Sequence, residues 1–296
     1  MVSMIDRYLI RYFLAVVDQG AFSRAAVQCN VAQPTLSVGI AKLERDLGVR
    51  LFVRSNQRVQ LTEDGSRFLI HARRIENEFH QAQSAMSGVR ERPTLRLGVL
   101  RSIPTALVAA AVAATPRGED QPRLELVEGS ERELNGFVAR GRLSVALTLV
   151  GRGGDRFAEE PLLEEDYRLA LSADHPLAER KSVAGEELAS EVMIVRRHCE
   201  VLSETSRYFT ERGVRPHFSL RSTNDDRVLA MVAAGLGLTV MPASHVAAGV
   251  RRPRLAGFDP RRTVGLIYGL DQEAAWRETA LLINLRQALR EAAAVD

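Results

Sequence analysis

The first sixty residues repeat apolar side chains at helical spacing and interrupt them with turn residues, which predicts three short helices. The first helix ends at Gly20, because glycine readily adopts the left-handed conformation found after a helix C-terminus. A second helix is expected over residues 24–29 with Ser23 as its N-cap, and a third over residues 34–47. The apolar positions of the first helix are Tyr8, Leu9, Tyr12, Phe13, Val16 and Val17.

Residues 49–61 alternate loosely around a polar tip at residues 55–58, and we expect them to form a two-stranded wing. From Thr62 the pattern becomes a long helix whose apolar residues step by four and three, as in a heptad repeat. This seam consists of Phe68, Ala72, Ile75, Phe79, Ala82, Met86 and Val89. Such a seam favours dimerisation through paired helices, although packing on the chain's own core would produce the same pattern. The helix ends at a polar hinge over residues 90–93, which a proline closes.

From residue 94 onward strand and helix patterns alternate, which indicates α/β lobes built on parallel sheets. The expected strands are 94–100, 123–128, 144–150, 166–172, 191–195, 216–222, 237–241 and 263–269. The expected helices begin at Pro104 and after Ser130, where Glu133 completes a capping box, and cover 200–212, 224–235, 243–248 and 273–293. The glycine-rich residues 151–154 favour a boundary between two lobes.

We therefore divide the chain into an N-terminal domain over residues 1–61, a linker helix and hinge over 62–92, and a C-terminal domain over 93–296. The first lobe of the C-terminal domain is expected to comprise residues 93–160 and 270–296, and the second lobe residues 161–269.

The composition is that of a globular protein, with 46% hydrophobic and 26% charged residues. No apolar run is long enough to cross a bilayer, and the first twenty residues lack the pattern of a secretion signal. We therefore expect a cytoplasmic protein without membrane contact. The two cysteines, Cys29 and Cys199, lie too far apart in sequence to indicate a metal site or a disulfide framework, and no cofactor is expected.

The basic residues are unevenly distributed along the chain. Residues 1–60 hold eight Lys and Arg against four Asp and Glu, whereas the remaining chain is close to neutral. A basic segment attracts nucleic-acid phosphates, although an ordinary solvated surface shows the same excess. Two short helices joined by a tight turn and followed by a wing are typical of a winged helix-turn-helix, whose second helix enters the major groove. Double-stranded DNA is therefore the expected partner.

Six segments resemble the signature of LysR-type transcription regulators, in a match that runs almost without gaps over residues 6–88. They read FLAVV from residue 13, GAFSRAA from 20, VAQPTLS from 31, KLE from 42, LGVRLFVR from 47 and LTEDG from 61. The resemblance implies an α/β protein with an N-terminal winged helix-turn-helix, a linker helix and two Rossmann-like lobes resembling a type 2 periplasmic-binding-protein fold. It also implies a small-molecule effector in the cleft between the lobes, and a homodimer or homotetramer on an inverted-repeat operator; contact with RNA polymerase stays open.

The N-terminal residues of a reading helix face the base edges. We expect Gln33 and Thr35 to contact bases, Lys42 to reach a phosphate, and Arg54 to reach the DNA backbone or the minor groove from the wing. The full set expected at DNA is Ser23, Arg24, Gln33, Pro34, Thr35, Ser37, Val38, Lys42, Arg54 and Arg58. An ordinary exposed polar side chain is the alternative for each.

Three positions depart from the family pattern. Ala32 stands where a serine that could cap the helix is common, and Val38 and Gly39 stand where longer polar residues are common. A glycine inside a helix is expected to cost roughly 1 kcal/mol relative to alanine. These departures leave DNA binding in place and make the operator sequence uncertain.

Effectors of α/β lobes bind at the carboxyl ends of parallel strands, near helix N-termini. The residues expected there are Arg101, Ser102, Ile103, Ser130, Thr148, His198, Cys199 and Thr223. Arg101 and Ser102 are the best candidates for ligand contact, whereas Ser130 and Thr223 are better explained as caps of the helices that follow them.

Cys199 follows two arginines and His198 and is expected to open a helix, and all of these features lower the pKa of a thiol. The His198-Cys199 pair resembles the peroxidatic site of peroxide-sensing LysR-type regulators. The corresponding stretch for their resolving cysteine, residues 206–209, contains none here. Two interpretations stay open, a sensor of oxidants or electrophiles and an ordinary cysteine that lines a pocket. Cys29 is expected in the core of the N-terminal domain.

Two other classes of protein fit the α/β lobes less well. An enzyme is disfavoured because the chain has no phosphate-binding glycine loop, no Gly-x-Ser-x-Gly motif, no metal-ligand spacing and no convincing acid–base pair. A solute-binding protein would need export and would not carry a reading helix.

Overall fold

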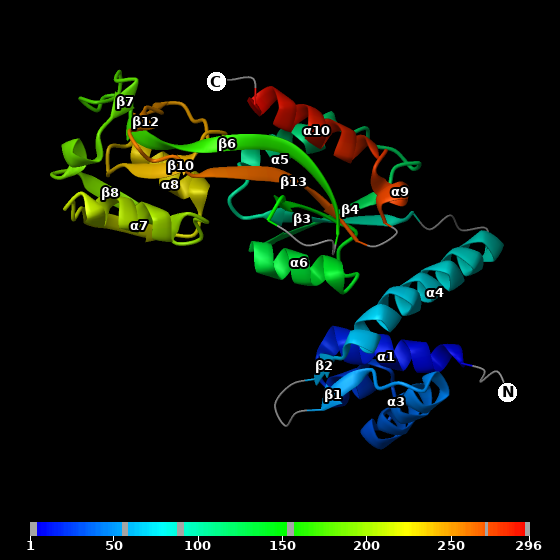
Figure 1. Cartoon of the computed structure of the whole chain (residues 1–296). Coiled ribbons are helices and arrows are strands. Elements are labelled where there is room, and N and C mark those ends of the chain that lie inside the picture. Colours follow the sequence, from blue (N-terminus) through cyan, green and yellow to red (C-terminus); the bar gives the residue numbers. More distant parts are fainter. Residues whose placement is uncertain (1–4, 55–58, 88–91, 153–156, 270–271, 294–296) are drawn as a thin grey trace. The chain divides into compact units, whose positions relative to one another are not determined.

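The computed structural model describes residues 5–54, 59–87, 92–152, 157–269 and 272–293 (Figure 1). The chain separates into two compact units, one formed by Met1–Pro93 with Ala139–Arg142 and the other by Thr94–Val138 with Leu143–Asp296. No helix in the described ranges has the length and apolar character needed to cross a membrane. We refer to these two compact units as unit 1 and unit 2, in the order given.

Unit 1 contains four helices and a hairpin within its described residues. They are α1 (Arg7–Gln19), α2 (Phe22–Gln28), α3 (Gln33–Leu47), β1 (Phe52–Arg54), β2 (Val59–Leu61) and α4 (Glu63–Ser87). Gly20 and Gly48 end α1 and α3 with φ of 62° and 71°, in the left-handed region that favours glycine. The predicted cap at Ser23 is wrong: α2 begins at Phe22 after an extended Ala21, so Ser23 lies inside its first turn.

One aromatic side chain of α1, Phe13, contacts both the wing and α4. Phe13 on α1 is fully buried and lies 5.3 Å from the ring of Phe52 on the wing and 5.0 Å from Phe68 on α4. Leu36 and Ile40 of α3 are buried in the same core. Because aromatic pairs at these separations add to the burial of apolar area, the wing and α4 are fixed against α1.

Gly39 allows α1 and α3 to approach closely. A Cβ at this position would lie 2.7 Å from Cδ2 of Tyr12 and 3.4 Å from a methyl carbon of Leu9, both on α1. The expected cost of glycine inside α3 is therefore offset by a helix contact that a larger residue would obstruct.

Unit 2 is built on a mixed sheet with strand order β4-β3-β5-β13-β6-β12-β7. Its first half contains β3 (Thr94–Leu100), α5 (Thr105–Ala114), β4 (Arg123–Gly129), α6 (Glu131–Ala139), β5 (Val145–Leu149) and β6 (Ala158–Ser172). The middle contains β7 (Ser182–Val183), the 3-10 helix η1 (Gly185–Leu188), β8 (Val192–Arg196), α7 (Leu202–Glu211), β9 (His217–Ser222) and α8 (Asp225–Ala233). The last part contains β10 (Thr239–Pro242), β11 (Val250–Arg251), β12 (Arg254–Leu255), β13 (Arg261–Tyr268), α9 (Glu273–Trp276) and α10 (Ala280–Ala293).

The predicted parallel pairing holds only in part. Strand β3 runs parallel to β4 and β5, and β8 runs parallel to β9, whereas β13 runs antiparallel to both β5 and β6. Figure 1 shows α5 and α10 on one face of this sheet and α6 on the other. The mixed α/β architecture with a lobe at each end of β6 confirms the predicted fold class.

Strand β6 passes from one hydrophobic core to the next. Its residues 158–166 pair with β13, and residues 167–172 pair with β10 and β11. The predicted strand at 166–172 covers only the second part of β6. The first part, residues 158–165, was missed because its four glutamates hide the alternation of apolar residues. Two of them are paired inside the fold: Glu160 accepts hydrogen bonds from Arg286 at 2.8 Å, and Glu165 from Arg262 at 2.8 Å.

Two predicted helices differ from the structure. Residues 243–249 form turns instead of a helix, because Arg252 binds the carbonyl oxygens of Pro242 and Ala243 that a helix would have used. The C-terminal helix is split into α9 and α10, and the Thr279 hydroxyl binds the carbonyl of Trp276 at the break. The other strands end within two residues of their predicted bounds.

We expect Gly39→Ala to destabilise unit 1 by about 1–3 kcal/mol, although helix propensity alone predicts a gain of about 1 kcal/mol. Hydrogen–deuterium exchange of the amides in α1 and α3 of the full chain measures this change. In a Tyr12→Ala background the added methyl group has room, so Gly39→Ala should cause no further loss there. A more stable Gly39→Ala protein with the native Tyr12 would show that the close approach is unimportant.

Candidate functional site

One side of α3 faces solvent and carries the side chains expected to read DNA. Gln33, Pro34 and Thr35 are exposed at its first turn, and Val38 is 66% exposed one turn later. Ser37 is half-buried, at the border of this surface. The opposite side of the helix is buried through Leu36, Ile40, Leu43 and Gly39. Helix α3 therefore presents a polar N-terminal surface on a rigid support, as major-groove reading requires.

Two of the basic residues expected at DNA are engaged within the unit. The Lys42 ammonium lies 3.2 Å from Asp6 and 3.5 Å from Asp46, so its charge is already paired. The Arg24 guanidinium is exposed and donates two hydrogen bonds to the carbonyl oxygen of Gln19. Ser23 is exposed beside it. Lys42 is thus a weaker candidate for a phosphate contact than its position in the sequence indicates.

The wing residues are described only in part. Arg54 is the last residue of β1, which pairs antiparallel with β2. Arg58, which we expected at the tip of the wing, lies outside the described residues.

The predicted heptad seam on α4 has two parts. Phe68 and Ala72 pack into the core of the same unit, and Ala72 is fully buried there. Farther along, Ile75 is 37% exposed, Phe79 44% and Met86 85%, and Ala82 is exposed too. Arg7 lies over the Phe79 ring at 4.4 Å and pairs with Glu76 at 2.8 Å. The last predicted seam residue, Val89, lies outside the described residues.

The residues expected to contact an effector lie in several different environments. Arg101 is held by two carboxylates, at 3.5 Å from Glu128 and 3.3 Å from Glu133, so its charge is neutralised locally. The Ser130 hydroxyl accepts a hydrogen bond from the N–H of Glu133, and the Glu133 carboxylate accepts one from the N–H of Ser130 at 2.8 Å, which confirms the capping box. Ile103 is buried in the hydrophobic core that contains β3, β5 and β13.

The remaining two residues of that set also differ from each other. Thr148 is fully buried on β5, and its hydroxyl finds no hydrogen-bond partner among the residues that the structure describes. Thr223 is exposed and does not cap α8, because Asn224 takes that role by accepting a hydrogen bond from the N–H of Arg227 at 2.8 Å.

Ser102 belongs to a buried cluster that joins the two lobes. Its hydroxyl donates to Glu200, which lies in the loop after β8, and accepts a hydrogen bond from Arg262 on β13 at 2.8 Å. Arg262 also donates to Glu200 at 3.1 Å and to Glu165 at 2.8 Å. The side chains of Arg262 and Glu200 are 1% and 7% exposed, so these charges are paired almost entirely out of water.

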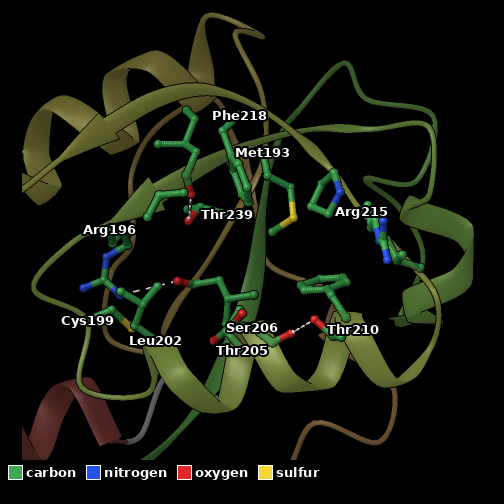
Figure 2. Close-up of a pocket in the computed structure, with 16 residues that line it drawn as sticks. Met193, Arg196, Cys199, Leu202, Thr205, Ser206, Thr210, Arg215, Phe218 and Thr239 are labelled. Carbon is green, nitrogen blue, oxygen red and sulfur yellow. Dashed lines mark hydrogen bonds between the residues drawn. The ribbon is translucent and has the colours of Figure 1, made fainter.

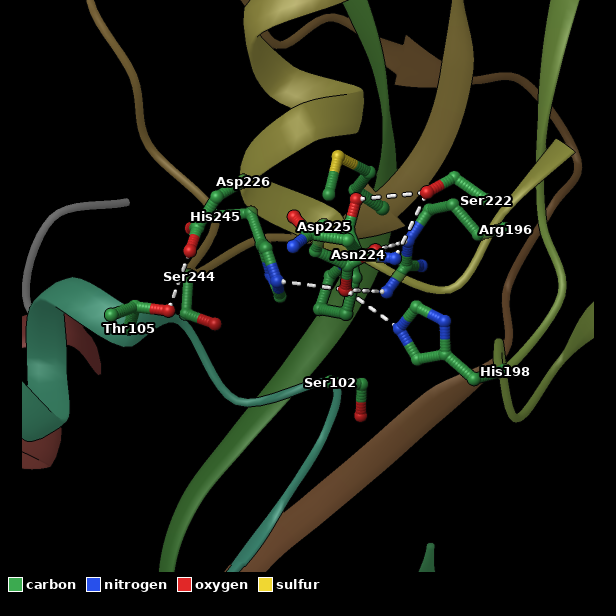
Figure 3. A network of polar contacts seen from close by, with 12 residues as sticks. Ser102, Thr105, Arg196, His198, Ser222, Asn224, Asp225, Asp226, Ser244 and His245 are labelled. Carbon is green, nitrogen blue, oxygen red and sulfur yellow. Dashed lines mark hydrogen bonds and ion pairs between the residues drawn. The ribbon is translucent and has the colours of Figure 1, made fainter. Parts of the chain in front are cut away.

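A second buried cluster surrounds Asp225 at the start of α8 (Figure 3). Arg196, at the end of β8, binds both oxygens of this carboxylate, with Nε 2.6 Å from Oδ1. His198 and His245 approach Oδ2 to 3.1 and 3.3 Å. Burial alone would raise the pKa of Asp225, but hydrogen bonds from Arg196, His198 and His245 hold it far below its ordinary value. Burial lowers the pKa of His245 to about 4, so this histidine is neutral at pH 7.

Cys199 lines a cavity of about 420 Å³ within the second lobe, between α7 and the strands β8 and β9 (Figure 2). Its apolar lining includes Met193, Leu202, Phe209, Val214 and Phe218, and its polar lining includes Thr205, Ser206, Thr210, Arg215 and Thr239. Cys199 lies at one end of the cavity and Arg215 at the other. The cavity is large enough for a small organic molecule or for a covalent adduct on the thiol.

The sequence-based argument for a reactive Cys199 thiolate is wrong in two respects. Helix α7 begins at Leu202, so Cys199 does not lie at a helix N-terminus. Burial raises the pKa of the thiol, the Arg196 charge opposes this effect, and the carboxylates of Glu200 and Asp225 add to it. Arg196 is already committed to Asp225, and the resting thiol is therefore protonated at pH 7. Cys29 is half-buried against the core of the other unit, as expected.

Sequence reasoning missed six residues of these clusters, namely Glu165, Arg196, Glu200, Asp225, His245 and Arg262. Each is a charged or polar residue, so exposure to solvent was the default expectation. Only the internal glutamates of β6, charges within an otherwise strand-like segment, hinted at buried partners.

Family models match both parts of the chain. Residues 8–66 match the bacterial regulatory helix-turn-helix protein model of the lysR family, and residues 89–293 match the LysR substrate binding domain. The two matches cover more than two thirds of the sequence, in agreement with the surface of α3 and the two lobes of unit 2. Unit 1 is therefore the DNA-binding unit and unit 2 the regulatory unit.

Curated relatives and solved structures agree with these models. A hydrogen peroxide-inducible genes activator from Pectobacterium carotovorum subsp. carotovorum is 29% identical over 95% of this chain and 96% of its own. The DNA-binding transcriptional dual regulator OxyR from Escherichia coli (strain K12) is 29% identical over 88% of both chains. A full-length OxyR variant from Pseudomonas aeruginosa shares the fold, with a TM-score of 0.62 and 24% identity over 96% of this chain and 95% of that one. The chain belongs to the LysR family of DNA-binding transcription regulators, and it is not an enzyme.

Proposed function

We propose that this regulator acts in the cytoplasm as a homodimer or homotetramer on an inverted-repeat operator. The exposed polar turn of α3 supports base reading by Gln33 and Thr35. The exposed apolar side chains of Ile75, Phe79 and Met86 support pairing of α4 with a second copy of the chain. A two-fold dimer presents two such helices to two half-sites, which accounts for a palindromic operator.

We further propose that the signal is an oxidant received at Cys199. The observation that carries this proposal is the position of Cys199, beside His198 at the wall of an open cavity of about 420 Å³. Relatives that are 29% identical are named hydrogen peroxide-inducible activators, which supports the same interpretation. The raised thiol pKa makes the resting residue slow to react, so the response would require a sufficient oxidant concentration.

The chemistry needs hydrogen peroxide and a small thiol. The Cys199 sulfur attacks one peroxide oxygen and the O–O bond breaks. The leaving hydroxide takes the thiol proton to form water, and cysteine sulfenic acid remains. With only two cysteines in the sequence, and Cys29 in the other unit, a small thiol then attacks the sulfenic sulfur and forms a mixed disulfide with loss of water. The cavity offers space for such an adduct.

A reversible effector is the second candidate. The mostly apolar lining of the cavity and the protonated thiol favour a small, largely apolar molecule bound without covalent chemistry. The effector was expected between the lobes, but Ser102 and His198 are there bound to Glu200 and Asp225. Under this alternative Cys199 only lines the cavity and takes no part in covalent chemistry.

The DNA surface predicts a separation of specific from non-specific binding. Gln33→Ala and Thr35→Ala should each weaken operator binding by about 1–3 kcal/mol and leave binding to random DNA nearly unchanged. Arg54→Ala should weaken both and reduce the salt dependence. Gel shifts at two salt concentrations measure these effects, with Gln287→Ala, an exposed glutamine of α10, as the matched control. Equal losses on both DNAs for Gln33→Ala would remove this residue from base reading.

The seam on α4 predicts the oligomeric state. Ile75→Asp with Phe79→Asp places like charges at a paired apolar surface, so we expect dissociation of the dimer and loss of operator affinity by at least about tenfold. Asn77→Asp adds charge at the helical position opposite the seam and should leave both unchanged. Sedimentation velocity and gel shifts provide the two measurements. An intact dimer in the double variant would exclude pairing through this seam.

Cys199→Ser separates the two candidate signals. If oxidation is the signal, peroxide with a small thiol should change operator affinity about 5–150-fold in the wild type and in Cys29→Ser, but not in Cys199→Ser. Intact mass should show one thiol adduct per chain. Because the thiol pKa is raised, alkylation of Cys199 should be slow at pH 7 and should accelerate only at alkaline pH. An oxidant response that survives Cys199→Ser would contradict the redox proposal and leave the reversible effector.

A further inference from the structure

Glu200 is bound in the way that a protein binds a small carboxylate ligand. Its Oε1 accepts hydrogen bonds from the Ser102 hydroxyl and from Arg262 Nη1, the latter at 3.1 Å. Its Oε2 accepts from the Tyr167 hydroxyl at 3.3 Å. The side chain is only 7% exposed, although its backbone lies in a loop, the kind of segment in which a glutamate is usually solvated.

The groups that bind this carboxylate come from three separate parts of unit 2. Ser102 follows β3 in the first lobe, Tyr167 lies on β6, and Arg262 lies on β13. Glu200 itself comes from the second lobe, 98 residues after Ser102. The Glu200 side chain therefore fills a position between the lobes.

Arg262, the charged member of the site, has partners other than Glu200 that fix its position. Arg262 Nε donates to Glu165 at 2.8 Å, and its Nη2 donates to the carbonyl oxygen of Ser102 at 3.0 Å. The Thr105 hydroxyl donates to Asp226 at 2.7 Å, which gives the two lobes a second contact. Removal of the Glu200 side chain would leave a buried cation, two hydroxyl groups and a space of the size of a carboxylate.

The charge balance agrees with this geometry. Burial alone would raise the pKa of Glu200, but the Arg262 charge and the Ser102 hydrogen bond outweigh it, so the pKa lies below its ordinary value. The group therefore binds as an anion at pH 7.

We propose that Ser102, Tyr167 and Arg262 form a carboxylate-binding site between the lobes, and that Glu200 is its built-in ligand. The chain thereby carries in its own sequence the anion that would otherwise be supplied by a free carboxylate effector. Because Glu200 directly follows Cys199, any change that displaces this loop would also open the site. The inference does not depend on redox chemistry at Cys199, and its test involves no oxidant.

Chemical rescue tests the site directly in the full chain. Glu200→Ala should lower the melting temperature, and sodium acetate should restore about 2–5 °C in a saturable manner that sodium chloride of equal ionic strength does not reproduce. A titration with ¹³C-labelled acetate should show one binding event in Glu200→Ala and none in the wild type. Glu204→Ala, which removes a carboxylate four residues later on α7, is the matched control and should not respond to acetate.

Glu200→Gln keeps the size of the side chain and should not be rescued, because the amide still fills the site. A folded Glu200→Ala without a saturable acetate effect, or an equal effect in the wild type, would overturn the proposal. Should Glu200→Ala not fold, the Glu200→Gln and Ser102→Ala pair decides. The double variant should lose less melting temperature than the two single variants lose together. A loss in the double variant equal to that sum would overturn the proposal.

Discussion

Three buried or largely buried arginines of the regulatory unit are paired with carboxylates from distant parts of the chain, and this pairing determines much of the unit's arrangement. Transfer of an unpaired charge out of water is prohibitive, and removal of one partner from a buried pair typically costs about 3–5 kcal/mol. Arg262, Arg196 and Arg286 each meet a carboxylate from a different part of the chain, namely Glu165, Asp225 and Glu160. The pairs of Arg262 and Arg286 include the two internal glutamates of β6 and so fix this strand in register between both cores.

The same pairs explain the state of Cys199. Cys199 is close to one carboxylate of each buried cluster. Glu200 follows it directly in the sequence, and Asp225 is near enough to raise the pKa of the thiol. Arg196 would stabilise a thiolate if it were free, but it binds both oxygens of Asp225. Formation of the reactive thiolate of Cys199 is therefore electrostatically unfavourable in the resting state. A chemical change at the thiol would also disturb the loop that carries Glu200.

The DNA-binding unit depends on close packing instead of buried charge. Phe13 holds the wing and α4, and Gly39 lets α3 approach Tyr12. Since α3 is supported on its buried side over most of its length, its exposed first turn is held in one orientation. The exposed apolar part of α4 begins where that helix leaves this core, after Ala72.

The amino-acid sequence by itself determined the features that depend on neighbours along the chain. Helical spacing, the glycines that end α1 and α3 and the capping box at Ser130 are local, and they located most helices and strands as well as the reading surface of α3. The antiparallel pairing of β6 with β13 was not visible, because it joins segments far apart in the sequence, such as Arg262 and Glu165, which are 97 residues apart. The state of Cys199 was predicted in the wrong direction for the same reason. Its basic neighbours in sequence favoured a thiolate, but the charge around a buried atom is set through space, and only the tertiary structure assigned Arg196 to Asp225 and placed two carboxylates near the sulfur.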